Sequence, residues 1–367
     1  MPEPTRLHRL IPALLLLAAA ASAQPLRPAG VPLDSLAVSF AEAHGLPSLV
    51  VGVVVDGHRY VVGAGDVNGR PPDAHTIYEI GSVTKVVTSL LLADAVSRGE
   101  TTLETPLTDL LGAPVGAHPG GPIRLVDLAT HASGLPRLDE AMFEQDGYDP
   151  ADPYARYTLE HLLAFLAEAE PATEPGQASG YSNAAVGALG YALARRATRS
   201  WEDLAHARIL APLGLTETMA AVPDSLAARI ATGHGEAGEP VAHWTFQDPT
   251  IGAGGLRSTA ADMLTFAEAA IHPEETPLDA AFALTLQPRR AVAERLHQGL
   301  AWQLVDLNGG GTMAFHDGGT GGFRSFFAAL PDDDLGIIVL TNRSVDVTAL
   351  AFDVLGRLRT ARAGLGG

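Results

Sequence analysis

The sequence has 367 residues, no cysteine, and 24 basic against 42 acidic side chains, so its formal net charge is −18 at pH 7. A chain this acidic is repelled by nucleic acids and by anionic membrane surfaces, which excludes both as expected partners. The absence of cysteine excludes a disulfide framework and a lipid-modified N-terminal cysteine.

The first residues have the pattern of a secretory signal peptide. Basic residues between Arg6 and Arg9 precede the apolar run Leu10–Ala21, and small residues follow it up to Ala23. The run is too short to span a bilayer, and small residues at this distance are typical of a signal-peptide cleavage site. We therefore expect residues 1–23 to be removed and the mature protein to be secreted or periplasmic.

The segments that follow show strand and helix patterns in turn. The stretch "LVVGVVVDGHRYVVGAG" (Leu49–Gly65) contains two β-branched runs joined at Asp56 and Gly57, which predicts a β-hairpin. From Ser82 to about Arg98 the apolar residues recur at helical spacing. Further helices are predicted at Leu159–Glu170, Asn183–Ala197, Glu202–Gly214, Thr259–Ile271 and about Val347–Arg362. Further strands are predicted at Gly299–Val305, Thr312–Asp317, Arg324–Leu330 and Leu335–Thr341.

This order of elements predicts an α+β fold. Strands at both ends of the chain indicate an antiparallel sheet built from both termini, with flanking helices and an inserted, mostly helical lobe. We expect residues 24–367 to form a single catalytic domain, with an α/β lobe at about 30–100 and 290–362 and a helical lobe at about 101–289. The active site is expected where the lobes meet, which is a common place for a pocket.

Lys85 is the only lysine in the chain, because the other 23 basic residues are arginines. Arginine stays protonated at any useful pH, whereas a buried lysine can lose its proton and act as a base. Ser82 precedes it by three residues and shares its face if the segment is helical. A lone lysine falls three residues after one of the 15 serines by chance with a frequency of about 4%. The pair therefore predicts a nucleophilic serine with an adjacent base.

Three short motifs resemble those of the penicillin-recognising serine hydrolases. "SVTK" at residues 82–85, "YSN" at 181–183 and "HDG" at 316–318 match, in order, the S-x-x-K, Y-x-N and K/H-x-G elements of that family. The chain is most similar to its branch of class C β-lactamases, D-aminopeptidases and EstB-type esterases. "LATHASGLP" from residue 128 and "GAGGLRSTAADMLTF" from residue 252 resemble connecting motifs of this branch. The resemblance implies a β-lactamase/transpeptidase-like fold.

The resemblance also implies roles for individual residues. Ser82 would attack the substrate carbonyl and Lys85 would help to deprotonate it. Tyr181 would be the second acid/base group, provided that Lys85 or His316 supplies positive charge. Asn183 would orient Lys85 and the acyl side chain. The backbone N–H groups of Ser82 and Gly319 would form the oxyanion hole.

The third motif departs from the pattern of many β-lactamases. His316 stands where they carry lysine, and Asp317 where they carry threonine or serine. Glycines after it, beginning with Gly318, let a substrate approach the backbone. We expect His316 to take part in catalysis and Asp317 to repel a substrate carboxylate beside the scissile bond. His131 is expected to brace a loop through a hydrogen bond.

The sequence thus predicts an exported serine hydrolase that acts through a Ser82 acyl-enzyme on esters, amides or β-lactams, with esterase or peptidase activity favoured. One alternative is a class C-like β-lactamase or a D-alanyl-D-alanine carboxypeptidase, and another is a non-catalytic sensor that binds peptidoglycan or β-lactams. The substrate would be a small molecule or short peptide. No metal or cofactor is expected, and the protein is expected to be a monomer without a membrane span.

Overall fold

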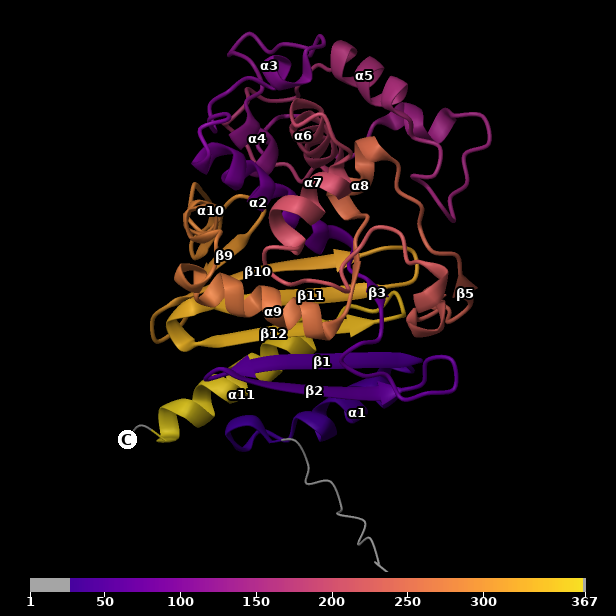
Figure 1. The fold of residues 1–367 in the computed structure, drawn as a ribbon, viewed down its shortest axis with the longest axis vertical. Coiled ribbons are helices and arrows are strands. Elements are labelled where there is room, and N and C mark those ends of the chain that lie inside the picture. Colours follow the sequence, from indigo (N-terminus) through magenta and orange to yellow (C-terminus); the bar gives the residue numbers. More distant parts are fainter. Residues whose placement is uncertain (1–26, 366–367) are drawn as a thin grey trace, which may run out of the picture.

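An eight-stranded antiparallel sheet forms one half of the computed structural model, which describes residues 27–365 (Figure 1). The predicted signal peptide lies outside the described residues. The order of the strands across the sheet is β2-β1-β12-β11-β10-β9-β8-β7. These strands are β1 (Ser48–Val55), β2 (His58–Gly65), β7 (Arg290–Ala293), β8 (Leu296–Gln298), β9 (Gln303–Asp306), β10 (Thr312–Gly319), β11 (Arg324–Leu330) and β12 (Leu335–Thr341).

Strands from the two ends of the chain lie side by side in this sheet. β1 pairs with β12 in a register that sets Leu49 opposite Thr341. The turn between β1 and β2 has positive φ values at both Asp56 (49°) and Gly57 (71°), as a two-residue hairpin turn matched to the strand twist requires. The predicted α+β fold, with an antiparallel sheet built from both termini, is confirmed.

Helices cover both faces of the sheet. α1 (Leu33–His44) and α11 (Thr348–Leu365) pack on one face, where their apolar residues meet alternate side chains of β1 and β12. α9 (Ala260–Ile271) packs on the other face, against β1, β11 and β12. The sequence assigns the segment of α9 to the helical lobe, and the structure corrects this assignment. An amphipathic pattern shows that a helix has an apolar face, but does not identify the surface that covers it.

The helical lobe lies above the sheet in Figure 1. Its helices, with α2 and α10 at the border, are α2 (Thr84–Ser97), α3 (Leu107–Leu111), α4 (Leu125–Ala129), α5 (Leu159–Glu168), α6 (Asn183–Arg196), α7 (Trp201–Ala205), α8 (Asp248–Gly254) and α10 (Asp279–Thr285). Two short ribbons complete the fold, β3 (Tyr78–Glu79) with β6 (Arg257–Ser258), and β4 (Gly233–His234) with β5 (Pro240–Val241). None of the described helices is both long and apolar enough to cross a membrane.

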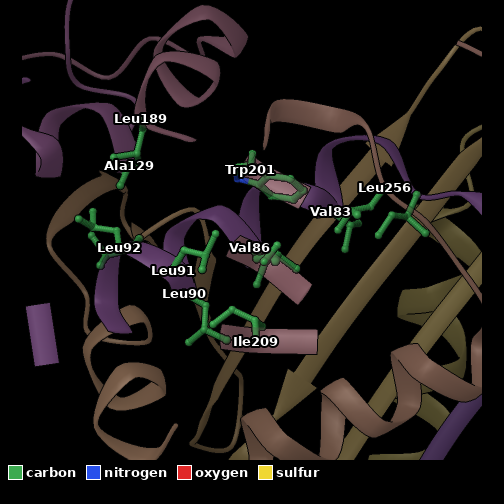
Figure 2. Packing of buried hydrophobic residues seen from close by; sticks show 14 of the residues in the cluster. Val83, Val86, Leu90, Leu91, Leu92, Ala129, Leu189, Trp201, Ile209 and Leu256 are labelled. Atoms are coloured by element: carbon green, nitrogen blue, oxygen red, sulfur yellow. The ribbon is translucent and has the colours of Figure 1, made fainter. Parts of the chain in front are cut away.

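Helix α2 is buried on every side and joins the two lobes. All of its residues from Thr84 to Ala95 are buried, and it packs against α6, α8 and α10. Trp201, Ile209 and Leu256 lie around it in the core (Figure 2). A helix that is apolar all round belongs in a protein core. A polar side chain in its first turn is therefore held away from bulk water.

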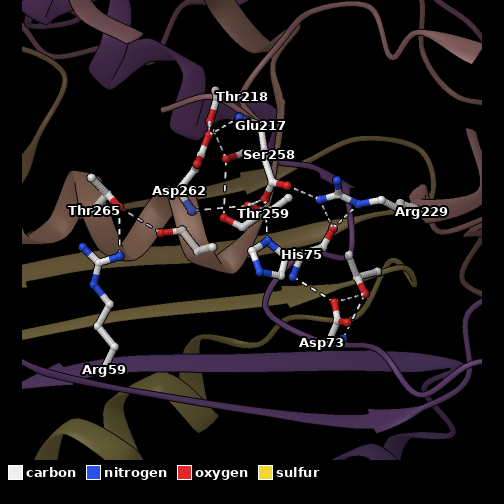
Figure 3. Close-up of polar contacts among 12 residues, drawn as sticks. Arg59, Asp73, His75, Glu217, Thr218, Arg229, Ser258, Thr259, Asp262 and Thr265 are labelled. Carbon is white, nitrogen blue, oxygen red and sulfur yellow. Dashed lines mark hydrogen bonds and ion pairs between the residues drawn. The ribbon is translucent and has the colours of Figure 1, made fainter. Parts of the chain in front are cut away.

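A polar cluster fixes the start of α9 to the loop that precedes β4 (Figure 3). Asp262 accepts hydrogen bonds from the backbone N–H of Glu217 (2.7 Å) and from the hydroxyl of Thr218 (2.8 Å). Glu217 in turn lies between His75 and Arg229 and pairs with both. Because Glu217 pairs with both Arg229 and His75 and Asp262 has hydrogen-bond donors, we interpret this cluster as structural.

The predicted secondary structure differs from the structure at three places. The segment Glu202–Gly214 was expected to form one helix, but α7 ends at Ala205 and a π-helical turn, His206–Leu210, follows it. The strands β7 and β8 at one side of the sheet were not predicted, because they are only four and three residues long and lack the alternation of a half-buried strand. The strand expected at Gly299–Val305 begins only at Gln303 and ends at Asp306.

We predict that Leu90→Ala lowers the free energy of unfolding by about 2–5 kcal/mol, the usual cost of a cavity left by a deleted core leucine. Leu90 is 1% exposed in the middle of α2. As a control, Val38→Ala on α1, where the residue is 43% exposed, should change the free energy of unfolding by less than about 0.5 kcal/mol. Urea denaturation measures both, and equal effects would contradict the central place of α2 in the core.

Candidate active site

Ser82 and Lys85 meet where the chain passes from β3 into α2. A 3₁₀ turn, Gly81–Val83, carries Ser82, and α2 begins directly after it at Thr84. The Nζ atom of Lys85 donates to the Ser82 hydroxyl (3.0 Å) and to the carbonyl oxygen of Ala253 (2.5 Å). Ser82 is partly exposed, whereas Lys85 is 0% exposed. A base is thus within reach of a hydroxyl that a substrate can approach.

The environment of Lys85 favours its neutral form. No carboxylate of the described residues forms an ion pair with it. Burial holds the pKa of Lys85 well below its usual value, and the charge of Arg137 lowers it further, while Asp317 opposes the shift. A neutral amine hydrogen-bonded to a serine is the state in which lysine can accept the proton of that serine.

Glycines allow β10 to pass directly beside the Ser82 turn. A methyl group on Gly318 would lie 2.0 Å from the carbonyl oxygen of Ile80, and one on Gly81 would lie 2.5 Å from the Gly319 nitrogen. Gly81 also has a positive φ of 51°. These positions therefore require glycine. The close approach brings Gly319 beside Ser82, as the predicted oxyanion hole requires.

Tyr181 is held beside Lys85 by a buried hydrogen-bond network around the next residue. Ser182 caps α6, donates its hydroxyl proton to the carbonyl of Pro136 (2.6 Å), and donates its backbone N–H to Nδ1 of His131 (3.2 Å). The centre of the Tyr181 ring lies 5.0 Å from Lys85 Nζ and 4.4 Å from the centre of the His131 ring. His131 therefore braces the loop, as the sequence analysis expects.

The phenol of Tyr181 is neutral in this environment. Burial raises its pKa above the usual value, and the Ser82 hydroxyl and the positive charge of Arg137 offset only part of that effect. The sequence analysis expected Lys85 or a histidine to supply the positive charge. The structure places an arginine in that position instead, with its guanidinium carbon 4.9 Å from the centre of the Tyr181 ring.

His316 lies on the side of β10 that faces the helical lobe. It is 2% exposed, and the centre of its ring is 6.4 Å from that of Tyr181. Burial lowers the pKa of His316 to about 4, although the neighbouring Asp317 opposes the shift. His316 is therefore neutral near pH 7, and it cannot replace the permanent charge of the lysine that many β-lactamases carry there.

Asp317 does not face the active site. It is exposed and lies opposite Phe326 in the pairing of β10 with β11. Phe326 belongs to the core under α1 and α11, on the far face of the sheet. Since side chains alternate along a strand, Asp317 points away when His316 points inward. The expectation that Asp317 repels a substrate carboxylate at the scissile bond thus loses its geometric basis.

Asn183 makes a different contact from the one expected. Its Nδ2 atom donates to the hydroxyl of Tyr154 (3.0 Å), and no hydrogen bond joins it to Lys85. Its Oδ1 atom is buried without a partner among the described residues. The side chain lines the same cavity as Ser82, where it remains within reach of a bound acyl group.

Two cavities are lined by the catalytic candidates. The first, which we call the Ser82 cavity, has a volume of about 250 Å³, and Ser82, Gly319, Asn183 and Arg137 lie in its wall. Its remaining lining is largely aromatic and apolar and includes Tyr154, Trp244 and Phe246. The second, the His316 cavity, has a volume of about 160 Å³ and is lined by His316, Tyr181, His131, Gln298 and Gln303, among others. A larger hollow of about 750 Å³, beyond Trp244 and Phe246, contains none of the predicted catalytic residues.

The sequence analysis did not find the residues that shape the Ser82 cavity. Arg137 directly follows the stretch "LATHASGLP", and this position next to a motif of the family was the one sequence feature that could have marked it as a site residue. Trp244 and Phe246 come from a loop that follows the preceding catalytic motif, "YSN" at 181–183, by more than 60 residues. Nothing in their local pattern indicates that Trp244 is anchored to the Glu79 carboxylate by its backbone N–H (3.1 Å).

Comparison with known proteins gives consistent matches over most of the chain. The family model described as Beta-lactamase matches residues 33–359. A β-lactamase of Escherichia coli K12 is 28% identical over 342 residues, which cover 83% of this chain and 86% of that protein. The D-alanyl-D-alanine-carboxypeptidase/endopeptidase AmpH of the same organism is 29% identical over 312 residues, covering 80% of this chain and 78% of that protein.

Solved structures agree with these matches. A class C β-lactamase from Rhodobacter sphaeroides has a TM-score of 0.75 at 26% identity, covering 89% of this chain and 99% of that one. The D-alanine carboxypeptidase AmpC from Burkholderia cenocepacia has the same TM-score and coverage at 27% identity. The predicted fold and the resemblance stated from the motifs are therefore confirmed.

We predict that Lys85→Met lowers kcat/KM by about 10²- to 10⁴-fold, the scale expected for a missing general base. Its thermal unfolding midpoint should not fall, because methionine fills the same buried space without an amine to desolvate. Lys85→Arg should lose both activity and stability, since a permanent charge would be buried without a counter-ion. Activity of either variant above a tenth of the wild-type value would contradict the role of Lys85.

We also predict that His316 makes the protein less stable in acid. Its pKa is about 4 in the folded state against 6.5 for an ordinary histidine, so the unfolded chain binds its proton first as the pH falls. Stability should therefore decrease from pH 7 to 4.5, by about 2 kcal/mol more in the wild type than in His316→Gln. Urea denaturation at both pH values measures this difference, and parallel losses in the two proteins would contradict the assignment.

Proposed function

Because the chain belongs to the β-lactamase family of serine hydrolases, we propose that it hydrolyses β-lactams and D-alanyl-D-alanine peptides through an acyl-enzyme on Ser82. The observation that carries this proposal is the buried Lys85 amine, which is unpaired with any described carboxylate and lies 3.0 Å from the Ser82 hydroxyl. We further propose that the protein acts outside the cytoplasm, in keeping with the signal-peptide pattern of residues 1–23.

The arrangement supports a simple sequence of steps. Lys85 takes the proton of the Ser82 hydroxyl as its oxygen attacks the substrate carbonyl, and the N–H groups of Ser82 and Gly319 stabilise the oxyanion. The bond to the leaving group breaks, and the neutral phenol of Tyr181 supplies a proton to that group. The proton taken by Lys85 then restores the phenol. In the second half of the reaction a water attacks the acyl-enzyme and gives up its proton to the same groups. The bond between the acyl carbon and the Ser82 oxygen then breaks, the Ser82 oxygen takes that proton, and the acid is released.

The choice of substrate class rests on the relatives. Those compared above carry the names β-lactamase and D-alanyl-D-alanine carboxypeptidase, and they match most of the chain. They favour this alternative over the esterase or peptidase activity favoured by the sequence analysis. A non-catalytic sensor has little need of a neutral lysine beside its serine, so the state of Lys85 argues against that alternative.

One observation favours ester hydrolysis as a second candidate. β-Lactams and D-alanyl peptides carry a carboxylate beside the scissile bond, and His316 is neutral where many β-lactamases carry a lysine. A site without that charge discriminates less against substrates whose leaving group is neutral. Short-chain aryl esters are therefore the appropriate comparison.

We predict that the mature protein hydrolyses a chromogenic cephalosporin and releases D-alanine from a diacetyl-lysyl-D-alanyl-D-alanine peptide, and that Ser82→Ala abolishes both activities. A 4-nitrophenyl ester is assayed in parallel to test the second candidate. Mass spectrometry of the penicillin-treated protein should locate the adduct at Ser82. Turnover of the ester alone would replace the first candidate by the second. An adduct at another serine, or no adduct and no turnover, would overturn the proposed mechanism.

A further inference from the structure

Arg137 presents a guanidinium group to the Ser82 cavity that is not engaged by the protein. It makes no side-chain hydrogen bond or ion pair with any residue from 27 to 365. The guanidinium of Arg137 lies over the ring of Tyr181. The face of an aromatic ring attracts a cation but does not occupy the N–H donors of the guanidinium. By contrast, Arg257 nearby is tied to the Glu79 carboxylate (3.0 Å). The five donors of the Arg137 guanidinium are therefore available to a ligand.

The backbone of Arg137 is fixed although the residue is exposed. Its carbonyl oxygen accepts hydrogen bonds from the N–H groups of Asn183 (2.9 Å) and Ala184 (3.3 Å), at the start of α6. The preceding carbonyl, of Pro136, accepts the hydroxyl of Ser182 (2.6 Å). The backbone of Arg137 is thus anchored to the same turn that carries Tyr181, so the fold sets where its side chain starts, beside the Ser82 cavity.

Arg137 is the one charged side chain in the lining of the Ser82 cavity as the described residues define it. No aspartate or glutamate lines this cavity, and aromatic rings form much of its wall, with Tyr154 stacked on Phe246 at 4.7 Å. An apolar wall beside a charge directs more of its field into the cavity than water would. On a protein whose net charge is −18, this cavity is a local site that attracts anions.

The two cavities divide the substrate between them. Tyr181, which protonates the leaving group in the proposed mechanism, lines the His316 cavity. Ser82, Gly319 and Asn183 line the other cavity together with Arg137. The leaving group therefore lies towards His316 and the acyl portion lies in the Ser82 cavity. Arg137 consequently meets the acyl portion, on the opposite side of the scissile bond from the carboxylate of a penicillin nucleus.

We propose that the Ser82 cavity selects acyl groups that carry a carboxylate and that Arg137 binds this carboxylate. The inference rests on the proposed acyl-enzyme at Ser82, and adds to it the chemical class of the acyl group. The planar fork of a guanidinium matches a carboxylate with two parallel hydrogen bonds, and the aromatic wall accommodates the apolar chain that leads to it.

The first experiment compares two esters that differ in one charge. Mono(4-nitrophenyl) adipate carries a free carboxylate at the end of its acyl chain, and the methyl ester of the same compound does not. The wild-type protein should hydrolyse the anionic ester with a kcat/KM about tenfold higher, the scale of one charge-assisted hydrogen bond. The preference should shrink as sodium chloride is raised from 0.05 to 0.5 M, because salt screens the pair.

Variants then assign the preference to Arg137. Arg137→Gln should reduce the ratio of the two kcat/KM values to about one, and Arg137→Lys should keep much of it, since the charge remains and only the fork is lost. Arg199→Gln is the matched control, because Arg199 is exposed, has no side-chain partner among the described residues and lines none of the cavities. It removes the same charge from the molecule and should leave the ratio unchanged.

A pair of penicillins tests the same contact on the acyl-enzyme itself. Carbenicillin differs from benzylpenicillin by a carboxylate on its acyl side chain, and both carry the same phenyl ring and nucleus. Acylation of Ser82, followed by mass spectrometry, should be faster for carbenicillin in the wild type, and this advantage should disappear in Arg137→Gln.

The outcomes separate the inference from the function on which it rests. Turnover of both esters at equal kcat/KM, or a ratio that Arg137→Gln leaves unmoved, would overturn the inference and leave the serine hydrolase in place. If Arg199→Gln also loses the preference for the anionic ester, the net charge of the protein sets that preference and the Arg137 contact does not. That result would also overturn the inference. Failure of every probe to react at Ser82 would remove the proposed function and the inference with it.

Discussion

The active site depends on one physical constraint, the burial of an amine without a counter-charge. Lys85 lies in the first turn of a helix that is buried on all sides, and the partners of its Nζ atom are a hydroxyl and a carbonyl oxygen. A charged ammonium in such a place costs several kcal/mol, so the protein holds the amine neutral. The same burial that destabilises the charged form makes the group a base. The burial that costs the protein stability at Lys85 is therefore the same burial that catalysis requires.

The second requirement is a close contact between two backbones. The sheet meets the Ser82 turn through glycines, because any side chain at Gly81 or Gly318 would overlap backbone atoms of the opposite segment. Ser325 reinforces the contact by donating its hydroxyl proton to the Ile80 carbonyl (2.8 Å). Catalytic groups from the first and last parts of the chain are therefore positioned by packing, and not by a hydrogen bond between their own side chains. This arrangement explains why the site lies at the junction of the two lobes.

Charge is distributed around the site by burial. His316 and Tyr181 are both neutral near pH 7 because they are enclosed, and Asp317 stays exposed on the far face of β10. The permanent positive charge in the wall of the Ser82 cavity is therefore that of Arg137, an exposed residue whose guanidinium lies over the Tyr181 ring. A histidine in the third motif does not reproduce the electrostatics of a lysine, although it occupies the same position in the sequence.

The sequence by itself determined most of the longer strands and helices, since β11 and β12 begin and end where their apolar runs predict. It also identified the pairing of Ser82 with Lys85, because residues three apart on one helix are neighbours whatever the rest of the fold does. The tertiary structure alone decided that α9 lies on the sheet, that Asp317 points away, and that Arg137 and Trp244 share a cavity with Ser82. Local patterns record periodicity and spacing, whereas the neighbours of a side chain depend on which distant segments pack against it. Contacts between residues far apart in the chain are therefore set by the packing of the whole core.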